Sequence, residues 1–394
     1  MPKLHLKPNR DRAVRRFHPW IFSGSVQRLE GSHTPGDVVE VFATDGDFLG
    51  RGFYNPNSQL ICRMLTWEDE AIDATFFQRK IENAYRLRLD LFGSNAPSTT
   101  NAFRVVNAEG DGLPGLIVDR YAEYLVVQIS TLGMSRFRNE IIAALQQIIQ
   151  PHGIFERSTG AALQEEGLQP VMQVLAGTEP PPLIHIRENS LHFVVNVQEG
   201  QKTGFFLDQR ENRVWAAKLG NGKNVLNGFG YTGAFSVYAK HAGARRVVTV
   251  DSSSAAIELA KQNFALNKLE VAAEDFVAAD IFHFLRSTMQ KFDCIILDPP
   301  AFAHRQKDVE NAARAYKDVN LQAMKIIEAG GLLLTCSCSQ PVSPDLFQKI
   351  LFGAAADAGR AVRVLGQSGH APDHPVSIYH PEGRYLQAML LHVS

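Results

Sequence analysis

From about residue 200, strand and helix patterns alternate along this chain, and this alternation restricts its fold more than any other feature. Apolar segments at 223–227, 245–251 and 292–298 are each followed by a stretch in which apolar residues recur at helical spacing. Parallel strands joined by helices form a doubly wound sheet of the α/β class. The last apolar segments, 362–367 and 385–393, are expected to form an antiparallel pair at the edge of this sheet.

The first strand of the alternation ends in a glycine-rich segment, NGFGYTGAF (residues 227–235). Gly228, Gly230 and Gly233 have the G-x-G-x-x-G spacing of loops that join a strand to a helix and hold a nucleotide. Asp251 ends the next strand, where a carboxylate can accept hydrogen bonds from ribose hydroxyls. A helix cap is the alternative role for Asp251. The pattern fits NAD and S-adenosylmethionine equally, because both contain an adenosine ribose.

The strand CIILD (294–298) is nearly all apolar, as expected of a central parallel strand, and it ends in Asp298, Pro299 and Pro300. Proline disfavours helical geometry, so the chain should leave the sheet extended, with Asp298 directed into the cleft at the carboxyl ends of the strands. This element suits an enzyme that brings a planar base or an amide nitrogen to a methyl donor. Asp280 ends the third strand region and is equally suited to contact an adenine amino group or to cap a turn.

The chain has four cysteines, of which two lie at the same sheet edge. Cys62 and Cys294 lie within apolar strands and are expected in the core. Cys336 and Cys338 end the strand GLLLTCSCS (331–339), and residues two apart in a strand share a face. A cysteine is more often a small buried apolar residue than a nucleophile, but these two lie where ligands bind. The spacing suits neither a disulfide framework nor a zinc site, so no metal is expected.

An acid, a thiol and a methyl donor together match one reaction, the methylation of a pyrimidine at C5. A thiolate that adds to C6 makes C5 electron-rich enough to take the methyl group. Asp298 would bond to N3 of the base and stabilise the adduct. A thiol is only partly ionised at neutral pH, so the site is expected to lower its pKa.

The first 73 residues are predicted to form a small β-barrel, because short apolar segments alternate with glycine and Asn-Pro turns. Residues 1–30 contain seven basic and two acidic residues, a net charge of +5, although the whole chain carries −1. Such a cluster attracts phosphate backbones, and a solvated surface that binds nothing is the alternative.

Residues 74–188 are predicted to form a middle α+β domain, with a helix at 71–92 and a linker at 93–102. The α/β domain then occupies residues 189–394. No apolar run is long enough to span a membrane, and the N-terminus lacks the apolar region of a secretory signal. The four cysteines suit no disulfide framework, so a reduced, cytoplasmic setting is expected.

Four segments, taken in order, carry a resemblance to a known family: GQKTGFFLDQRENR (200–213), LNGFGYTGAFSVYA (226–239), DPPAF (298–302) and TCSCS (335–339). Together they resemble the class I S-adenosylmethionine-dependent methyltransferases of bacteria and archaea that modify cytosine C5 in large-subunit ribosomal RNA. The segments HPWIFSG (18–24) and GDVVEV (36–41) resemble the PUA RNA-binding domain with which that family begins. The resemblance covers nearly the whole chain and implies a PUA-like barrel, a middle domain and a Rossmann-like catalytic domain.

The resemblance implies S-adenosylmethionine as cofactor and large-subunit ribosomal RNA as partner, and it leaves a homodimeric assembly open. It places the nucleophile in a T/S-C-S segment, which occurs twice in this chain; Cys338 is preferred and Cys336 is the alternative. Ala301 and Phe302 follow the prolines, where many relatives carry a second cysteine, so a helper thiol there is doubtful. The implied cofactor contacts are Asp208, Gln209, Asn227, Gly228, Phe229, Gly230, Thr232, Gly233, Asp251, Ser252, Asp280 and Asp298. The predicted RNA contacts are Lys7, Arg10, Arg12, Arg15 and Arg16.

Three other functions remain open on the sequence alone. A methyltransferase of the same fold could act on a nitrogen of RNA or protein and would need no thiol. An NAD-dependent oxidoreductase would use the glycine loop but would leave the Asp-Pro-Pro segment and the thiols without a role. A non-enzymatic RNA-binding module would require an inactive pocket.

Overall fold

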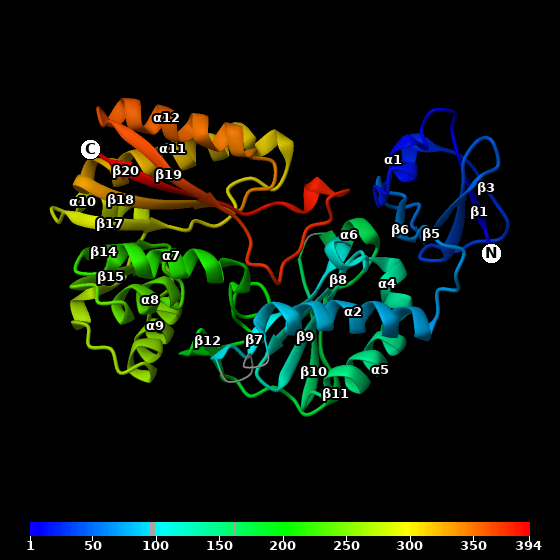
Figure 1. Ribbon diagram of the computed structural model, residues 1–394, viewed down its shortest axis with the longest axis horizontal. Coiled ribbons are helices and arrows are strands. Elements are labelled where there is room, and N and C mark those ends of the chain that lie inside the picture. Colours follow the sequence, from blue (N-terminus) through cyan, green and yellow to red (C-terminus); the bar gives the residue numbers. More distant parts are fainter. Residues whose placement is uncertain (94–98, 161) are drawn as a thin grey trace. The chain divides into compact units, whose positions relative to one another are not determined.

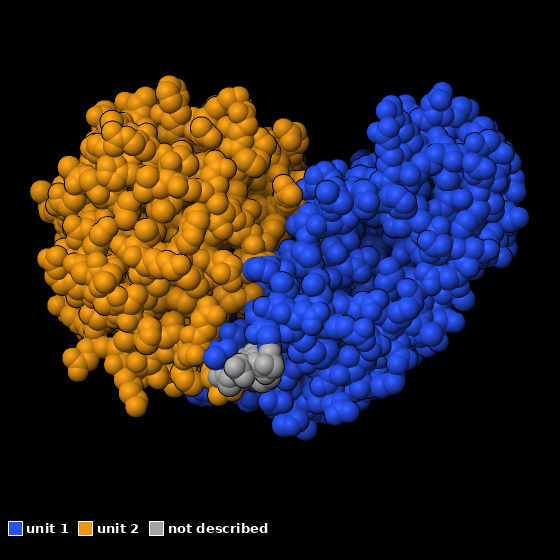
Figure 2. Space-filling model, in the orientation of Figure 1, with its two compact units in different colours: residues 1–186, 195–205, 372–383 blue, residues 187–194, 206–371, 384–394 orange. Residues whose placement is uncertain are grey.

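The computed structural model describes residues 1–93, 99–160 and 162–394 (Figure 1). Part of the predicted linker at 93–102 therefore lies outside the described residues. The chain divides into two compact units, which Figure 2 colours separately. The first unit contains residues 1–186, 195–205 and 372–383, and the second contains residues 187–194, 206–371 and 384–394. The division into domains at 1–73, 74–188 and 189–394 stays a prediction.

The N-terminal part of the first unit is a six-stranded sheet in the order β2-β6-β5-β4-β1-β3. Its two end strands, β2 and β3, both come from residues 1–30. A buried core that includes Leu4, Leu6, Val39 and Val41 supports the sheet. The elements are β1 (Lys3–Leu6), α1 (Arg12–Arg15), β2 (Trp20–Ile21), β3 (Val26–Glu30), β4 (Val38–Phe42), β5 (Phe48–Tyr54) and β6 (Cys62–Thr66).

A five-stranded sheet in the order β11-β10-β9-β8-β7 follows in the same unit. The predicted helix at 71–92 is confirmed as α2 (Ala74–Phe92), and the Asp73 side chain caps it by accepting from the backbone of Thr75 and Phe76. The other elements are β7 (Ala102–Asn107), β8 (Leu116–Tyr121), β9 (Tyr124–Ile129), α4 (Leu132–Arg136), α5 (Arg138–Ile149), β10 (Gly153–Ser158), α6 (Ala162–Glu166) and β11 (Val171–Gly177). A short hairpin, β12 (Ile184–Glu188) and β13 (Leu191–Val195), leads to the second unit.

The second unit contains the predicted doubly wound sheet, with strand order β16-β15-β14-β17-β18-β20-β19. The predicted antiparallel pair at the sheet edge is confirmed, because β20 pairs antiparallel with both β18 and β19. The direction of winding reverses between β14 and β17, and ligands of such sheets bind at this point, beyond the carboxyl ends of the strands. The strands are β14 (Asn224–Gly228), β15 (Arg246–Asp251), β16 (Phe276–Ala278), β17 (Phe292–Leu297), β18 (Ile327–Ser337), β19 (Val362–Ser368) and β20 (Gln387–Val393).

Helices cover both faces of this sheet: α10, α11 and α12 on one side and α7, α8 and α9 on the other (Figure 1). The third strand region, which was predicted to end at Asp280, is short, because β16 has three residues and α10 begins at Ile281. Asp280 starts this helix by accepting a hydrogen bond from the backbone N–H of His283 at 2.9 Å. The helices are α7 (Arg210–Gly220), α8 (Ala234–His241), α9 (Ser254–Leu266), α10 (Ile281–Ser287), α11 (Val309–Ile326) and α12 (Pro344–Ala358).

Candidate active site

The glycine-rich loop joins β14 to α8 at the carboxyl edge of the sheet. Its glycines are required by close packing as much as by any ligand. A Cβ on Gly230 would lie 2.6 Å from Cγ2 of Thr249. Gly233 has φ +75°, and a Cβ there would lie 2.9 Å from Cβ of Ala260. The loop is therefore packed tightly against β15 and α9.

Two other residues of this loop, Phe229 and Tyr231, have φ values of 60° and 46°. The left-handed region is costly for bulky residues, and such strain gathers at functional sites. Asp251 supports the strained loop, because its carboxylate accepts from the backbone of Tyr231 at 2.8 Å and of Ser253 at 2.9 Å. The alternative role of Asp251 as a helix cap is wrong, since α9 is capped by Ser253.

The start of α8 has the properties of an anion site. No side chain caps this helix, as in α7 and α11, whereas Ser253, Asp280 and Ser343 cap α9, α10 and α12. The N–H groups of a first helical turn attract carboxylates and phosphates when they are left uncapped. Asn227, at the base of the loop, is fully buried; it donates to Ser236 at 2.8 Å, but its Oδ1 has no partner among the described residues. The loop thus offers buried polar groups to a ligand.

Asp298 follows β17 and is held by a directed chain of hydrogen bonds. The Gln209 amide donates to Oδ1 of Asp298 at 2.7 Å, and Asn212 donates to Oε1 of Gln209 at 2.6 Å. The same Asn212 nitrogen also lies 3.3 Å from the carbonyl oxygen of Gly369. Because a carbonyl can only accept, the Asn212 atom that faces Gly369 and Gln209 must be its nitrogen. The Gln209 atom facing Asn212 is then the oxygen, so the Gln209 nitrogen faces Oδ1 of Asp298 and donates to it.

The segment that carries Cys338 is tied to the segment that carries Asp298. Ser339 accepts from the backbone N–H of Ala303 at 3.0 Å and shares a hydrogen bond of 2.9 Å with the Tyr316 hydroxyl. The Cys338 thiol is partly exposed and lies 3.6 Å from the carbonyl oxygen of Pro299. The acid and this thiol therefore sit on neighbouring loops with a fixed connection.

Cys336 and Cys338 are in different environments, although they are two residues apart. β18 ends at Ser337, so Cys338 lies beyond the strand, whereas Cys336 is buried in the core beside α7 and α8. Burial, together with the nearby charge of Asp298, raises the pKa of the Cys336 thiol well above its ordinary value. Cys62 and Cys294 are core residues, as predicted, and burial raises the pKa of each to about 12.

Three partly buried aromatic rings gather at this edge of the sheet. Phe229 of the glycine loop, Phe282 of α10 and Phe302 after β17 have pairwise centroid distances of 6.2 to 6.4 Å. The sequence prediction included Phe229 but missed Phe282 and Phe302. Both could have been found, because they lie two residues after Asp280 and directly after the Asp-Pro-Pro-Ala segment.

The remaining predicted cofactor residues, Asp208, Thr232 and Ser252, lie in three separate segments. Asp208 is buried in the 3-10 helix η3 (Leu207–Gln209) and accepts a hydrogen bond of 2.6 Å from the Tyr385 hydroxyl. Thr232 is buried in the glycine loop, and its backbone oxygen accepts from Asn263 at 2.8 Å. Ser252 is exposed directly after β15.

In the first unit, the five predicted RNA contacts Lys7, Arg10, Arg12, Arg15 and Arg16 are all exposed. Arg15 differs from the others because its guanidinium is within 3.0 Å of Asp11, Asp45 and Asp47. Its charge is therefore largely compensated by these three carboxylates.

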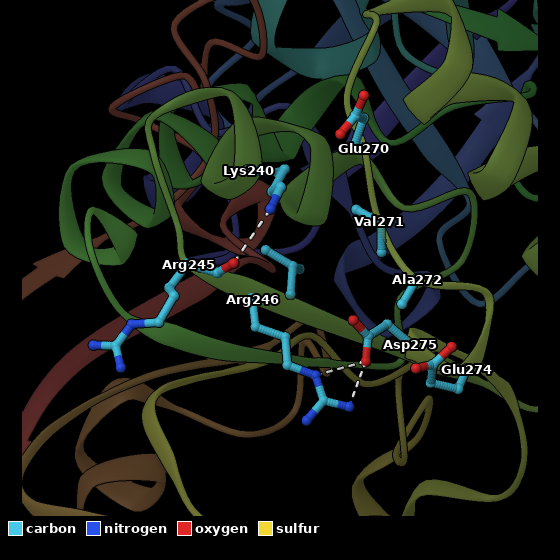
Figure 3. A pocket seen from close by; sticks show the side chains of 9 residues that line it. Lys240, Arg245, Arg246, Glu270, Val271, Ala272, Glu274 and Asp275 are labelled. Atoms are coloured by element: carbon cyan, nitrogen blue, oxygen red, sulfur yellow. Dashed lines mark hydrogen bonds and ion pairs between the residues drawn. The ribbon is translucent and has the colours of Figure 1, made fainter.

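The second unit contains a cavity of about 520 Å³ (Figure 3). Arg246, the first residue of β15, lines it, whereas the glycine loop meets the last residue of that strand. Arg246 is paired with Asp275 at 2.5 Å, and Lys240 donates to the carbonyl of Arg245 (Figure 3). The cavity is thus at the amino end of the strand, opposite the sheet edge that carries the glycine loop.

Neither a metal cluster nor a membrane helix is found in the described part of the chain. No group of three or more His, Cys, Asp or Glu residues there could hold a metal ion. Of the helices described, none has the length and hydropathy needed to cross a bilayer.

Comparison with known proteins identifies two domain families. Residues 4–67 match the model of a PUA-like domain, and residues 168–376 match the model of S-adenosylmethionine-dependent methyltransferases. Two similar curated proteins are both named ribosomal RNA large subunit methyltransferase I. The one from Alteromonas mediterranea is 42% identical over 393 residues, covering 99% of this chain and 98% of its own length. The one from Yersinia pestis is 40% identical over 395 residues and covers 99% of both chains.

Solved structures show the same fold over the full chain. A chain from Streptococcus mutans assigned to the SAM-dependent methyltransferases has a TM-score of 0.85, with 24% identity and complete coverage of both chains. A methyltransferase-type chain solved in complex with SAH has a TM-score of 0.86 at the same identity and coverage. At this identity the likeness concerns the fold alone.

Proposed function

Since the chain belongs to the S-adenosylmethionine-dependent methyltransferases that begin with a PUA-like domain, we propose that it methylates C5 of a cytosine in large-subunit ribosomal RNA. The family excludes the NAD-dependent oxidoreductase that the glycine loop alone would allow. The choice of ribosomal RNA rests on the names of relatives that match this chain from end to end. The observation that carries the choice of C5 is the partly exposed Cys338 thiol, which lies 3.6 Å from the carbonyl oxygen of Pro299, the residue that follows Asp298.

The glycine loop and its surroundings fit S-adenosylmethionine. We assign the methionine carboxylate to the uncapped start of α8 and the ribose hydroxyls to Asp251, each of whose oxygens can accept a second hydrogen bond. The rings of Phe229, Phe282 and Phe302 form an apolar wall suited to the adenine. Bound there, the cofactor supplies an electrophilic methyl group on a sulfonium.

Cys338 is the proposed nucleophile. Its thiolate adds to C6 of the cytosine and forms the S–C6 bond. The electron pair of the C5–C6 double bond is then shared between C5 and N3. C5 then takes the methyl group and loses its proton to water. The electron pair of that C–H bond restores the C5–C6 double bond, and the S–C6 bond breaks to return the thiolate. Cys336 is a poor substitute, because it is fully buried and its pKa is raised.

Asp298 is proposed to stabilise the adduct at N3 of the base. Gln209 always presents a donor to Oδ1, so a proton carried by Asp298 resides on Oδ2 and is donated from there. This proton neutralises the negative charge that N3 gains when the thiolate adds to C6. The hydrogen-bond chain therefore decides which oxygen serves the base, and Gln209 acts as a positioning residue rather than as a cofactor contact.

The target cytosine must leave its stack to reach a site of this kind, as in other enzymes that act on bases. The exposed basic residues of the first unit are proposed to bind RNA phosphates and so orient the substrate. This contribution is independent of sequence and should weaken with salt.

The experiment is transfer of a labelled methyl group to purified large-subunit ribosomal RNA, followed by digestion to nucleosides and mass spectrometry. We expect the label in 5-methylcytidine, with its loss in Cys338→Ser and Asp298→Asn. Cys336→Ser is the matched control and should retain turnover. Label in an N-methylated nucleoside, or in protein, would instead support a methyltransferase of this fold that needs no thiol.

A further inference from the structure

The first unit contains a cavity of about 400 Å³ that no predicted site uses. Three aromatic side chains that are far apart in the sequence line it: Phe17 after α1, Trp67 after β6, and Tyr379. The Phe17 ring lies 5.6 Å from Trp67 and 5.2 Å from Tyr379 between centroids. Phe17 is 46% exposed and Tyr379 is 50% exposed, so the ring cluster is open to solvent on one side.

The backbone at Phe17 is in an unfavourable conformation. Its φ of +66° lies in the left-handed region, where glycine usually ends a helix such as α1. The ring is half-exposed, so packing against Trp67 and Tyr379 compensates for this conformation only in part. Strained residues of this kind gather at ligand sites.

The charges around the cavity favour a polar ring as its occupant. The two acids in its wall are already paired, since Asp111 binds the guanidinium of Arg88 at 2.6 Å and Glu109 accepts from the Trp20 indole at 2.9 Å. Lys80 lines the same wall and forms no ion pair with a described residue. The cavity therefore presents ring faces and one cation.

We propose that this cavity, the aromatic cavity, holds an unpaired nucleobase of the RNA substrate. The base stacks on Phe17 and Tyr379, and Lys80 donates to a ring nitrogen or carbonyl oxygen. Arg16 directly precedes Phe17 and is exposed, so a phosphate of the same nucleotide or its neighbour is in reach. Stacking on aromatic side chains beside basic groups is how proteins hold single-stranded RNA. The inference rests on the proposed function, since it takes RNA as the substrate.

The first test measures the affinity for a single-stranded RNA of mixed sequence at several salt concentrations. Phe17→Gly removes the ring and relieves the backbone, so affinity should fall about 5- to 150-fold while the melting temperature stays equal or rises. The slope of log affinity against log salt should not change. Arg16→Gln should instead lower that slope by about one. Phe352→Ala is the matched control, because this exposed ring lies on α12 of the other unit.

The second test replaces one nucleotide at a time by an abasic residue. At one position, the abasic residue should lower the affinity of the RNA for the wild type and for Phe352→Ala. The same abasic RNA should bind Phe17→Gly and Tyr379→Ala as tightly as the unmodified RNA does. Unchanged affinity of both cavity variants would overturn the aromatic cavity, as would a melting temperature lowered in step with binding. A wild-type protein that binds no RNA and methylates only protein would overturn the proposed function itself.

Discussion

Cys336 and Cys338 show how much two neighbouring residues can differ in chemistry. The sequence predicted that both lie at the carboxyl edge of the sheet, but it did not predict how exposed either thiol is. Cys336 lies within β18 and has 0% exposure, whereas Cys338 follows the strand and is partly exposed. The point at which the strand ends depends on pairing with β17 and β20, which no local pattern contains.

Thiol alkylation should report this difference directly. In the native protein, iodoacetamide is expected to modify Cys338 first, because thiolate and access are both required. Cys62, Cys294 and Cys336 should react only after unfolding, since burial raises the pKa of all three. Peptide mass spectrometry at increasing times gives the order. Early modification of Cys336 would contradict the assignment of the nucleophile.

The contact between Gln209 and Asp298 joins residues 89 positions apart, so the sequence could suggest only that Gln209 borders the cofactor. The structure supports a different role, in which the amide orients the acid. Gln209→Ala removes a hydrogen bond to a carboxylate, worth about 1.5–3 kcal/mol, and should lower kcat about 10- to 100-fold. The KM for S-adenosylmethionine should stay nearly constant.

The isosteric change Gln209→Glu supplies the control for shape. It replaces the amide donor beside Asp298 with a carboxylate, which can only accept a hydrogen bond. Its kcat should therefore fall as in Gln209→Ala. A raised KM for S-adenosylmethionine with an unchanged kcat would restore Gln209 to the cofactor contacts.

Among the elements, the glycine loop was the easiest to predict, because its pattern of glycines lies within six consecutive residues. The structure adds the reason for the glycines, which is the approach of Thr249 and Ala260 rather than contact with a ligand alone. The segment 274–285 was harder to predict. Its apolar residues fit a strand, but the cap at Asp280 turns most of them into helix α10.

Gly233→Ala should destabilise the second unit by about 2–4 kcal/mol. Its positive φ costs about 1 kcal/mol for alanine, and overpacking against Ala260 adds about 1–3 kcal/mol. Gly222→Ala is the matched control, because φ is +71° there and a Cβ would meet open space. Urea unfolding of the two variants gives the difference. Equal losses would show that crowding at the loop has no cost.

At the scale of the molecule, the main feature hidden from the sequence is the path of the chain between the units. Residues 372–383 lie between β19 and β20 in sequence, yet they belong to the first unit. Asp373 accepts from the backbone of Arg104 at 2.9 Å, and its carbonyl oxygen accepts from Arg88 at 2.9 Å. These contacts span more than 260 positions, so periodicity and turn signals could not reveal them.

His380, in the same segment, should make stability depend on pH. Burial lowers the pKa of His380 below its ordinary 6.5, although Glu109 and Glu382 oppose this shift. Below pH 6.5 the unfolded chain binds a proton that the folded chain does not, so stability present above 6.5 is lost as the pH falls toward the folded pKa. Melting temperatures at about pH 7.5 and about pH 5.5 should differ less in His380→Gln than in the wild type. An identical pH dependence would rule out this residue as a source.

The most direct measurement of the central claim is covalent trapping on RNA that contains 5-fluorocytosine. Fluorine cannot leave C5 as a proton does, so the S–C6 bond should persist after methyl transfer and link protein to RNA. With S-adenosylmethionine present, the wild type and Cys336→Ala should both form an adduct that survives denaturing electrophoresis, and Cys338→Ala should form none. Absence of the wild-type adduct, or an adduct that persists in Cys338→Ala and is lost in Cys336→Ala, would contradict the account.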